Sequence, residues 1–153
     1  MLYLVRHAKA SSRREWKGDD RLRPLTASGH RQAEALATEL TGRRVTSLVS
    51  SPYLRCVETL QPTARAIGAA VATDECLGEG GSYDDVLALM SSLPDGAVLC
   101  SHGDVIPETI AALERRGCKI TSPPDWRKGS VWVLDRDDAG KIRKAKAWPP
   151  PNT

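Results

Sequence analysis

The residue types best suited to chemistry fall where predicted strands end. Arg6 and His7 directly follow the apolar run of residues 2–5, in the stretch LVRHAKASSRR, which gathers several further cations around one imidazole. His102 directly follows Ser101 at the end of a second apolar run, AVLCS. A histidine with a purely structural role does not need several cations around it. A histidine that handles phosphate does, because guanidinium groups form bidentate, charge-assisted bonds to phosphoryl oxygens.

A second arginine joins this set. Arg55 lies one turn into the helix predicted to follow the strand VTSLVS, residues 45–50. In parallel α/β sheets the carboxyl ends of the strands form the ligand crevice. If the strands that precede His7, Arg55 and His102 are parallel neighbours, these side chains and Arg6 converge at one edge of the sheet.

Phosphoryl transfer fits these residues better than two other chemistries. One imidazole can be neutral near pH 7 and attack phosphorus, and the second can stay protonated beside the bound anion. A zinc site is disfavoured because arginines repel a cation and no H-x-x-x-H pair is present. A serine hydrolase is disfavoured because Ser101 and His102 are neighbours on one strand, without a G-x-S-x-G elbow.

Composition limits the class of protein. With 153 residues, 41% hydrophobic and 27% charged, the chain is expected to form one globular domain. No apolar run approaches the roughly 20 residues that cross a bilayer, so we predict a cytoplasmic protein without membrane contact. The mild net charge of +3 and 5% aromatic content argue against nucleic-acid binding. Four singly spaced cysteines give no structural zinc motif, and we predict neither metal nor cofactor.

Strand-like and helix-like segments alternate along the chain, which favours a largely parallel α/β sheet. Helices are predicted to begin at Thr26 or Ser28, at Ser51–Pro52, at Ser82 with Asp85 closing a capping box, and at Asp104. Pro62 is predicted to break or kink the second of these helices. Strands are predicted at residues 2–5, 45–50, 69–73 and 97–101, with a closing pair at 130–135 and 142–148. We expect one domain over residues 1–148 and a Pro-rich tail over 149–153.

Four ordered motifs resemble the histidine phosphatase superfamily, also called phosphoglycerate mutase-like. They are LVRHAKA, DDRLRPLTASGHRQAEAL, SSPYLRCVETLQP and SHGD, which together cover the chain from Met1 to about Trp148. The short length and the RHAK motif resemble the SixA-type branch. The chain is also similar to the phosphatase domain attached to Nudix hydrolases in actinobacteria. The resemblance implies a three-layer αβα sandwich with a mostly parallel central sheet.

The resemblance also implies roles for single residues. It makes His7 the nucleophile that forms a phosphohistidine, and it makes Arg6, Arg55 and His102 the ligands of the transferred phosphoryl group. Glu79, in CLGEGGSYDD, stands where the family places its general acid. Other carboxylates lie close enough in sequence to be alternatives, namely Glu75, Asp84 and Asp85.

The chain departs from the family pattern beside the nucleophile. Ala8 replaces the usual glycine, and Lys9 replaces an acidic residue, which weakens any transfer of sugar-phosphate mutase specificity. Solvated surface charge is the simpler interpretation of the cations in this loop. The candidate substrate contacts are Lys9, Arg13, Arg14 and Trp126.

The expected function is hydrolysis of a phosphomonoester or phosphoramidate without metal. A phosphohistidine on a partner protein is the favoured substrate, and a nucleotide or small phosphorylated metabolite is the alternative. A phosphate-binding module without turnover is the alternative of another class.

Overall fold

Strand β1 (Leu2–Arg6) is apolar on both faces, as a strand covered on both sides by helices must be. Leu2 and Leu4 point into one core cluster, whereas Tyr3 and Val5 point into the other. The computed structural model describes residues 1–153, and the same separation into two cores holds across its central sheet. The sheet is thus the middle of three layers.

Seven strands form this sheet in the order β3-β2-β4-β1-β6-β7-β5. The strands β1, β2, β3 and β4 are parallel to one another, β6 is antiparallel to β1, and β7 is antiparallel to β6. The bounds of the remaining strands are Ser47–Ser50 (β2), Val71–Thr73 (β3), Ala97–Ser101 (β4), Lys119–Ile120 (β5), Val131–Arg136 (β6) and Ile142–Trp148 (β7).

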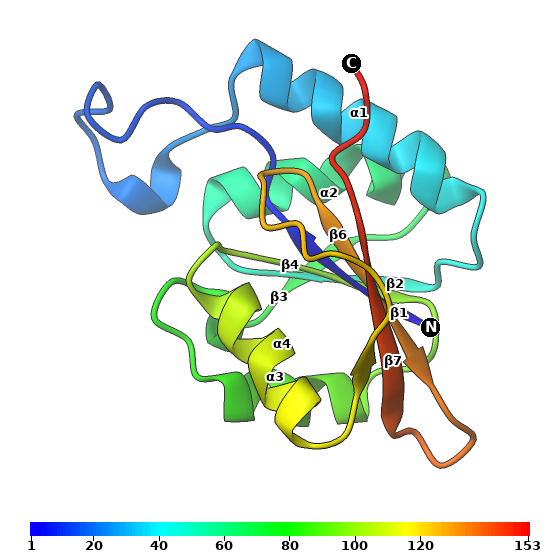
Figure 1. Cartoon of the computed structure of the whole chain (residues 1–153). Coiled ribbons are helices and arrows are strands. Elements are labelled where there is room, and N and C mark those ends of the chain that lie inside the picture. Colours follow the sequence, from blue (N-terminus) through cyan, green and yellow to red (C-terminus); the bar gives the residue numbers. More distant parts are fainter.

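Two helices cover each face of the sheet. Figure 1 shows α1 (Ala27–Thr41) and α2 (Leu54–Ile67) above it, with α3 (Tyr83–Ser92) and α4 (Val105–Arg115) below. Two short 3₁₀ turns, η1 (Asp20–Leu22) and η2 (Glu75–Leu77), lie in the loops beside the carboxyl ends of the strands. No helix combines the length and the apolar character that crossing a membrane requires. The expected αβα sandwich with a mostly parallel sheet is confirmed.

The start of α2 differs from the prediction. This helix begins at Leu54 with Tyr53 as its N-cap residue, not at Ser51 and Pro52. The hydroxyl of Ser51 instead accepts a hydrogen bond from the Tyr53 amide and contacts a histidine ring described below. The helix also continues through Pro62 to Ile67, so the predicted break is absent.

Two predicted capping contacts are also absent. Ser82 caps α3 through the Asp84 amide, but the structure contains no reciprocal bond from Asp85. Asp104 occupies the N-cap position of α4, yet its carboxylate bonds to a different loop. Strand β5 has only two residues and was not predicted. Residues 149–153 form no helix or strand.

Gly29 allows helix α1 to lie against the loop that follows β1. A Cβ atom at this position would overlap the backbone carbonyl of Lys9, which accepts a hydrogen bond from Thr26 at the helix start. We expect Gly29→Ala to lower the free energy of unfolding by about 1–3 kcal/mol, despite the higher helix propensity of alanine. Urea unfolding followed by circular dichroism measures this change.

Gly42 is the matched control, because it lies at the other end of α1 with φ −73° and its Cβ would meet nothing closer than 3.5 Å. Gly42→Ala should change stability by less than about 0.5 kcal/mol. A Gly29→Ala protein as stable as the Gly42→Ala protein would contradict the close packing.

Candidate active site

The pairing of β1 with β4 places two histidines side by side. Arg6 lies opposite Ser101 in this parallel pair, and the His7 amide donates a hydrogen bond of 3.1 Å to the Ser101 carbonyl. The next residue after each strand is a histidine, and the ring centroids of His7 and His102 are 5.4 Å apart. The structure therefore brings together the two imidazoles that the sequence separates by about a hundred residues.

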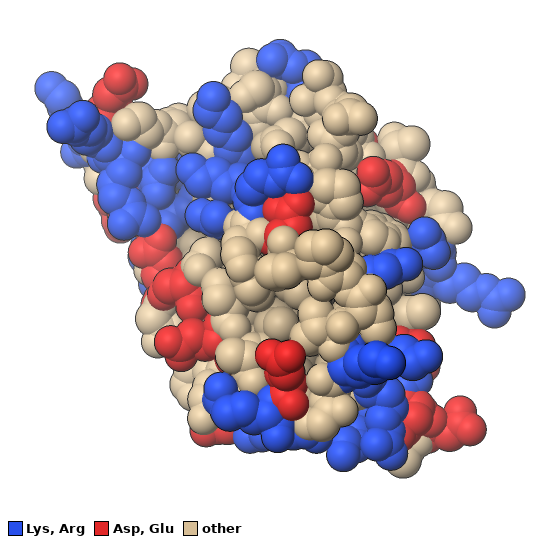
Figure 2. Space-filling model, in the orientation of Figure 1, with Lys and Arg blue, Asp and Glu red and all other residues tan.

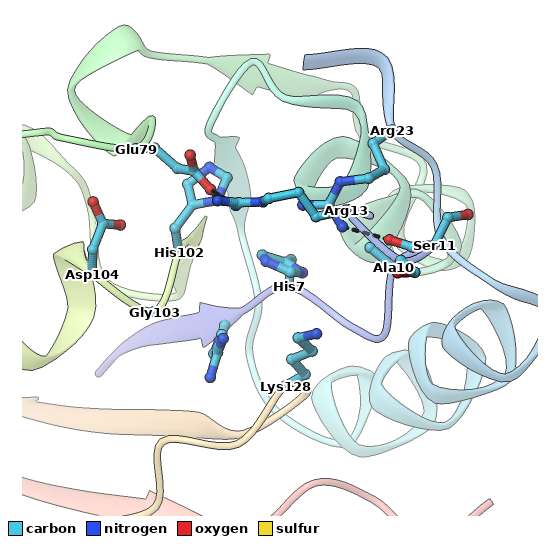
Figure 3. Close-up of a pocket in the computed structure, with 12 residues that line it drawn as sticks. His7, Ala10, Ser11, Arg13, Arg23, Glu79, His102, Gly103, Asp104 and Lys128 are labelled. Atoms are coloured by element: carbon cyan, nitrogen blue, oxygen red, sulfur yellow. Dashed lines mark hydrogen bonds and ion pairs between the residues drawn. The ribbon is translucent and has the colours of Figure 1, made fainter. Parts of the chain in front are cut away.

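A cavity of about 600 Å³ opens beside these rings (Figure 3). Figure 2 shows Lys and Arg side chains gathered on this part of the molecule, over the loop between β1 and α1. One lining residue, Ala10, is hydrophobic. The lining residues are Arg6, His7, Ala10, Ser11, Ser12, Arg13, Arg23, Glu79, His102, Gly103, Asp104 and Lys128.

His7 is held as a neutral imidazole with one nitrogen available. Its Nδ1 lies 2.8 Å from the Ala8 carbonyl oxygen, which can only accept, so the proton is on Nδ1 and the lone pair is on Nε2. Burial lowers the pKa of His7 from 6.5 to about 3, and the charges of His102, Arg55 and Arg6 act in the same direction. At neutral pH the ring therefore carries an unprotonated Nε2.

Thr59, which sequence reasoning missed, fixes the backbone behind this imidazole. Its hydroxyl accepts a hydrogen bond of 2.9 Å from the Ala8 amide and donates one of 2.7 Å to the carbonyl of Arg55. Thr59 is fully buried and lies one helical turn after Arg55. This spacing could have identified Thr59 from the sequence, because residues four apart lie on the same face of a helix and Arg55 was already a candidate site residue.

The other imidazole, that of His102, is held by groups in the turn between β2 and α2 and in the first turn of α2. Its Nε2 lies 2.8 Å from the Ser51 hydroxyl and 3.5 Å from Cys56 Sγ, and the Tyr53 ring meets it edge-on at 4.7 Å. His102 Nδ1 has no hydrogen-bond partner and lies 3.8 Å from Glu79 Oε1. Ser51 was predicted only as a helix cap, although its place after β2, the neighbour of β4, indicates a contact with His102.

Arg55 lies behind the cavity and does not line it. Its side chain is fully buried, and Nη2 donates to Glu79 Oε1 at 2.7 Å and to Asp20 Oδ2 at 3.1 Å. Nη1 donates to the Asp20 carbonyl, whereas Nε is buried without a partner. Two carboxylates therefore neutralise the predicted phosphate ligand in the free protein.

Glu79 lines the cavity from the loop between β3 and α3. Its Oε1 accepts hydrogen bonds from Arg55 and also from Arg13, at 2.8 Å, whereas Oε2 has no protein partner. The next amide, that of Gly80, donates a bond of 2.8 Å to Asp104 Oδ2. Asp104 thus ties this loop to the start of α4 instead of capping that helix.

Arg6 lines the cavity beside Gly103. Its Nη1 donates to the Trp126 carbonyl at 2.6 Å, and its Nε is buried without a partner. A Cβ atom on Gly103 would lie 2.7 Å from Arg6 Cζ, so a larger residue here would displace this guanidinium from its position. Burial lowers the pKa of Arg6, and the charge of Asp104 partly opposes that effect.

The candidate substrate contacts divide into two groups. Arg13 lines the cavity, whereas Lys9, Arg14 and Trp126 do not. The Trp126 ring packs against Trp132, with centroids 5.2 Å apart. The structure adds lining residues that were not predicted as site residues, and the charged ones are Arg23, Asp104 and Lys128. The structure contains no group of three or more His, Cys, Asp or Glu side chains placed to hold a metal ion.

The fold and this cavity define an αβα class of protein with a ligand crevice at the carboxyl ends of parallel strands. A family model described as "Histidine phosphatase superfamily (branch 1)" matches residues 2–87. The chain therefore belongs to the histidine phosphatase superfamily, and phosphatase is the enzyme class that this membership supports.

Individual relatives agree with this placement. An 8-oxo-(d)GTP phosphatase from Mycolicibacterium smegmatis is 34% identical over 97% of this chain and 48% of that protein. This chain spans about half or less of the curated relatives it matches. The structure of the protein histidine phosphatase SixA with tungstate has a TM-score of 0.76 at 21% identity, covering 96% of this chain and 93% of that one. A Nakamurella multipartitia protein assigned to the SixA phosphohistidine phosphatases has a TM-score of 0.67 at 27% identity, covering 96% and 92%.

The protonation state of His7 can be measured directly. We expect its imidazole ¹⁵N shifts to stay those of the neutral Nδ1–H tautomer from pH 8 down to pH 5, because its pKa is lowered to about 3. Titration of the same resonances in urea-unfolded protein is the control, where the ordinary pKa near 6.5 should return. A folded-state titration midpoint near 6.5 would contradict the neutral ring.

The same shift affects stability. Between pH 6.5 and about 3 the unfolded chain binds a proton at His7 that the folded chain does not bind. His7 therefore does not reduce the free energy of unfolding above pH 6.5. Below that pH, its effect lowers the free energy of unfolding progressively down to about pH 3.

Proposed function

We propose that this chain removes phosphoryl groups from an anionic substrate through a covalent phosphohistidine on His7. The observation that carries the proposal is the unprotonated Nε2 of a buried imidazole beside a cavity lined by cations. Nitrogen without a proton is the form of imidazole that attacks phosphorus. The roles of the surrounding groups follow from their positions.

In the first step His7 Nε2 bonds to phosphorus and the bond from phosphorus to the leaving oxygen breaks. Arg6 and His102 line the cavity on the side of the strand ends and hold the equatorial oxygens. Arg55 joins them when a phosphoryl oxygen displaces the Glu79 carboxylate from its Nη2. In the second step a water molecule cleaves the P–N bond, which restores His7 and releases phosphate.

Glu79 is the proposed general acid and base. Its Oε1 is occupied by two guanidinium groups, so Oε2 is the oxygen available to carry a proton to the leaving oxygen. After that transfer the carboxylate accepts a proton from the attacking water. Glu75, Asp84 and Asp85 do not line the cavity, which favours Glu79 among the carboxylates of this segment.

Two substrate classes are supported by different observations. The SixA phosphatases share the fold, which supports a phosphohistidine on a partner protein. The 34% identical relative is named for a nucleotide, which supports a small phosphorylated molecule. The volume of the cavity, about 600 Å³, favours the second class, because it provides room for a small phosphorylated molecule.

The covalent intermediate can be tested by trapping. We expect wild-type protein, quenched after mixing with a ³²P-labelled phosphate donor, to carry an acid-labile, base-stable adduct. His7→Ala should abolish the adduct, because it removes the nitrogen that bonds to phosphorus, whereas Nε2 of His102, the other imidazole of the cavity, lies against the Ser51 hydroxyl. His30→Ala is the matched control, since His30 is exposed on α1 and does not line the cavity.

Label retained on the His7→Ala protein would rule out the proposed nucleophile. A wild-type protein that binds phosphate but never forms the adduct would indicate a phosphate-binding module without turnover.

The role of Glu79 predicts a dependence on the leaving group. Glu79→Gln keeps an Oε1 acceptor for both arginines but cannot transfer a proton. We expect the rate constant for phosphorylation of His7, measured in the pre-steady state, to fall by about 10²-fold with an alkyl phosphate and by less than about 3-fold with p-nitrophenyl phosphate, because nitrophenolate leaves without a proton. Glu75→Gln, an exposed carboxylate paired with Arg21, is the control and should leave both rates unchanged. Equal losses on both substrates would show that Glu79 only holds Arg55.

A further inference from the structure

Two cations that line the cavity have no task in the reaction proposed above. Arg23 reaches the cavity from the loop between β1 and α1, and Lys128 reaches it from the loop before β6, close enough for the charge of Arg23 to lower the pKa of Lys128. In Figure 3, His102 and Lys128 lie on opposite sides of His7. A phosphoryl group on His7 that also contacts His102 therefore leaves the Lys128 side of the cavity unfilled.

Arg23 is a buried and preorganised cation. Its exposed fraction is 5%, its Nε donates to Asp20 Oδ1 at 2.8 Å, and its Nη1 donates to the Ser11 carbonyl at 2.6 Å. Nη2 has no protein partner and the residue lines the cavity. A guanidinium held at two of its nitrogens loses little conformational freedom when the third binds an anion.

Lys128 is a cation without a counter-ion. Its ammonium group makes no hydrogen bond or ion pair within the chain, although the side chain lines the cavity. Burial lowers its pKa, and the charges of Arg6, Arg23 and Lys9 lower it further. The charges with the largest effect on Lys128 are all cations, so cations dominate the electrostatic environment of its ammonium group.

The cavity is also larger than one phosphate group needs. Its volume is about 600 Å³. A phosphate group has the bulk of a few water molecules, each occupying about 30 Å³ in the liquid. The remaining space is walled by polar and basic side chains with Ala10 as the one hydrophobic residue. A second anionic group suits this space better than an apolar or aromatic group.

We propose that Arg23 and Lys128 form a second anion subsite, which holds the phosphate next to the one that His7 receives, so that the substrate class is a diphosphate. This inference rests on the proposed function for its chemistry. His7 Nε2 bonds to the terminal phosphorus while the bond from that phosphorus to the bridging oxygen breaks. The bridging oxygen takes the proton of Glu79 and leaves with the inner phosphate. The oxygen of water then bonds to phosphorus as the P–N bond to His7 Nε2 breaks, the water gives a proton back to Glu79, and inorganic phosphate departs.

Binding of non-hydrolysable phosphonates tests the subsite without turnover. We expect isothermal titration calorimetry to show that wild-type protein binds methylenediphosphonate at least about 10-fold more tightly than methylphosphonate, because charge-assisted bonds to the second phosphonate are added. Lys128→Met keeps the length of the side chain and should reduce the preference to about 2-fold or less. Lys128 is exposed, so this variant should fold normally.

Lys17→Met is the matched control, because Lys17 is an exposed lysine of the loop between β1 and α1 that does not line the cavity. It makes the same change in net charge and should keep the full preference. Equal affinity of wild-type protein for the two phosphonates overturns the subsite, as does an undiminished preference in Lys128→Met. Loss of the phosphohistidine adduct with the preference intact would overturn the proposed function and leave the subsite standing.

Discussion

The parallel register between β1 and β4 is the constraint on which the site depends. Because Arg6 lies opposite Ser101, the two residues that follow are the two histidines, and both leave the sheet at the same edge. A slip of one residue would turn every side chain of β1 to the other face of the sheet. The two core clusters prevent that slip, since Leu2 and Leu4 fill one of them and Tyr3 and Val5 fill the other. Hydrophobic burial on both faces therefore sets the distance between two polar rings.

Two carboxylates also organise the site, because each forms ion pairs with the buried Arg55 and with a second arginine in the loop between β1 and α1. Asp20 bridges Arg23 and Arg55 through its two oxygens, and Glu79 bridges Arg13 and Arg55 through one oxygen. A fully buried guanidinium requires such partners, since an unpaired charge at this depth is strongly destabilising. The loops that follow β1 and β3 are thereby held together at the mouth of the cavity.

The sequence predicts those parts of the structure whose patterns repeat. Leu36 and Leu40 mark the buried face of α1, and the apolar runs mark the central strands, because burial imposes a period that can be counted. Strand β5 has two residues and no period to recognise. Serine is a common N-cap residue, and the sequence around Ser51 therefore predicts a helix start there. In the structure the Ser51 hydroxyl contacts His102 instead, so a tertiary interaction prevails over the local sequence preference.

In the site, too, some features can be predicted from the sequence and others depend on tertiary contacts. That the histidines meet follows from where two strands end, and this could be anticipated. That Arg55 lies behind Glu79 instead of lining the cavity depends on the conformation of an irregular loop. The same is true of Lys128, whose loop brings it to the cavity although its sequence neighbours Trp126 and Arg127 do not line it.

The electrostatics of the free protein favour an anion in this cavity over a cation. Burial lowers the pKa of His7, Arg6 and Lys128 alike, and neighbouring cations add to the effect at His7 and Lys128. Folding thus brings together positive charges that repel one another and are only partly balanced by carboxylates. An anion in the cavity relieves this repulsion, and by linkage it stabilises the folded state in proportion to the logarithm of its concentration above Kd. The proposed affinity for phosphate and the electrostatic cost of folding therefore have one cause, because the core packing that fixes the strands also holds these cations close together.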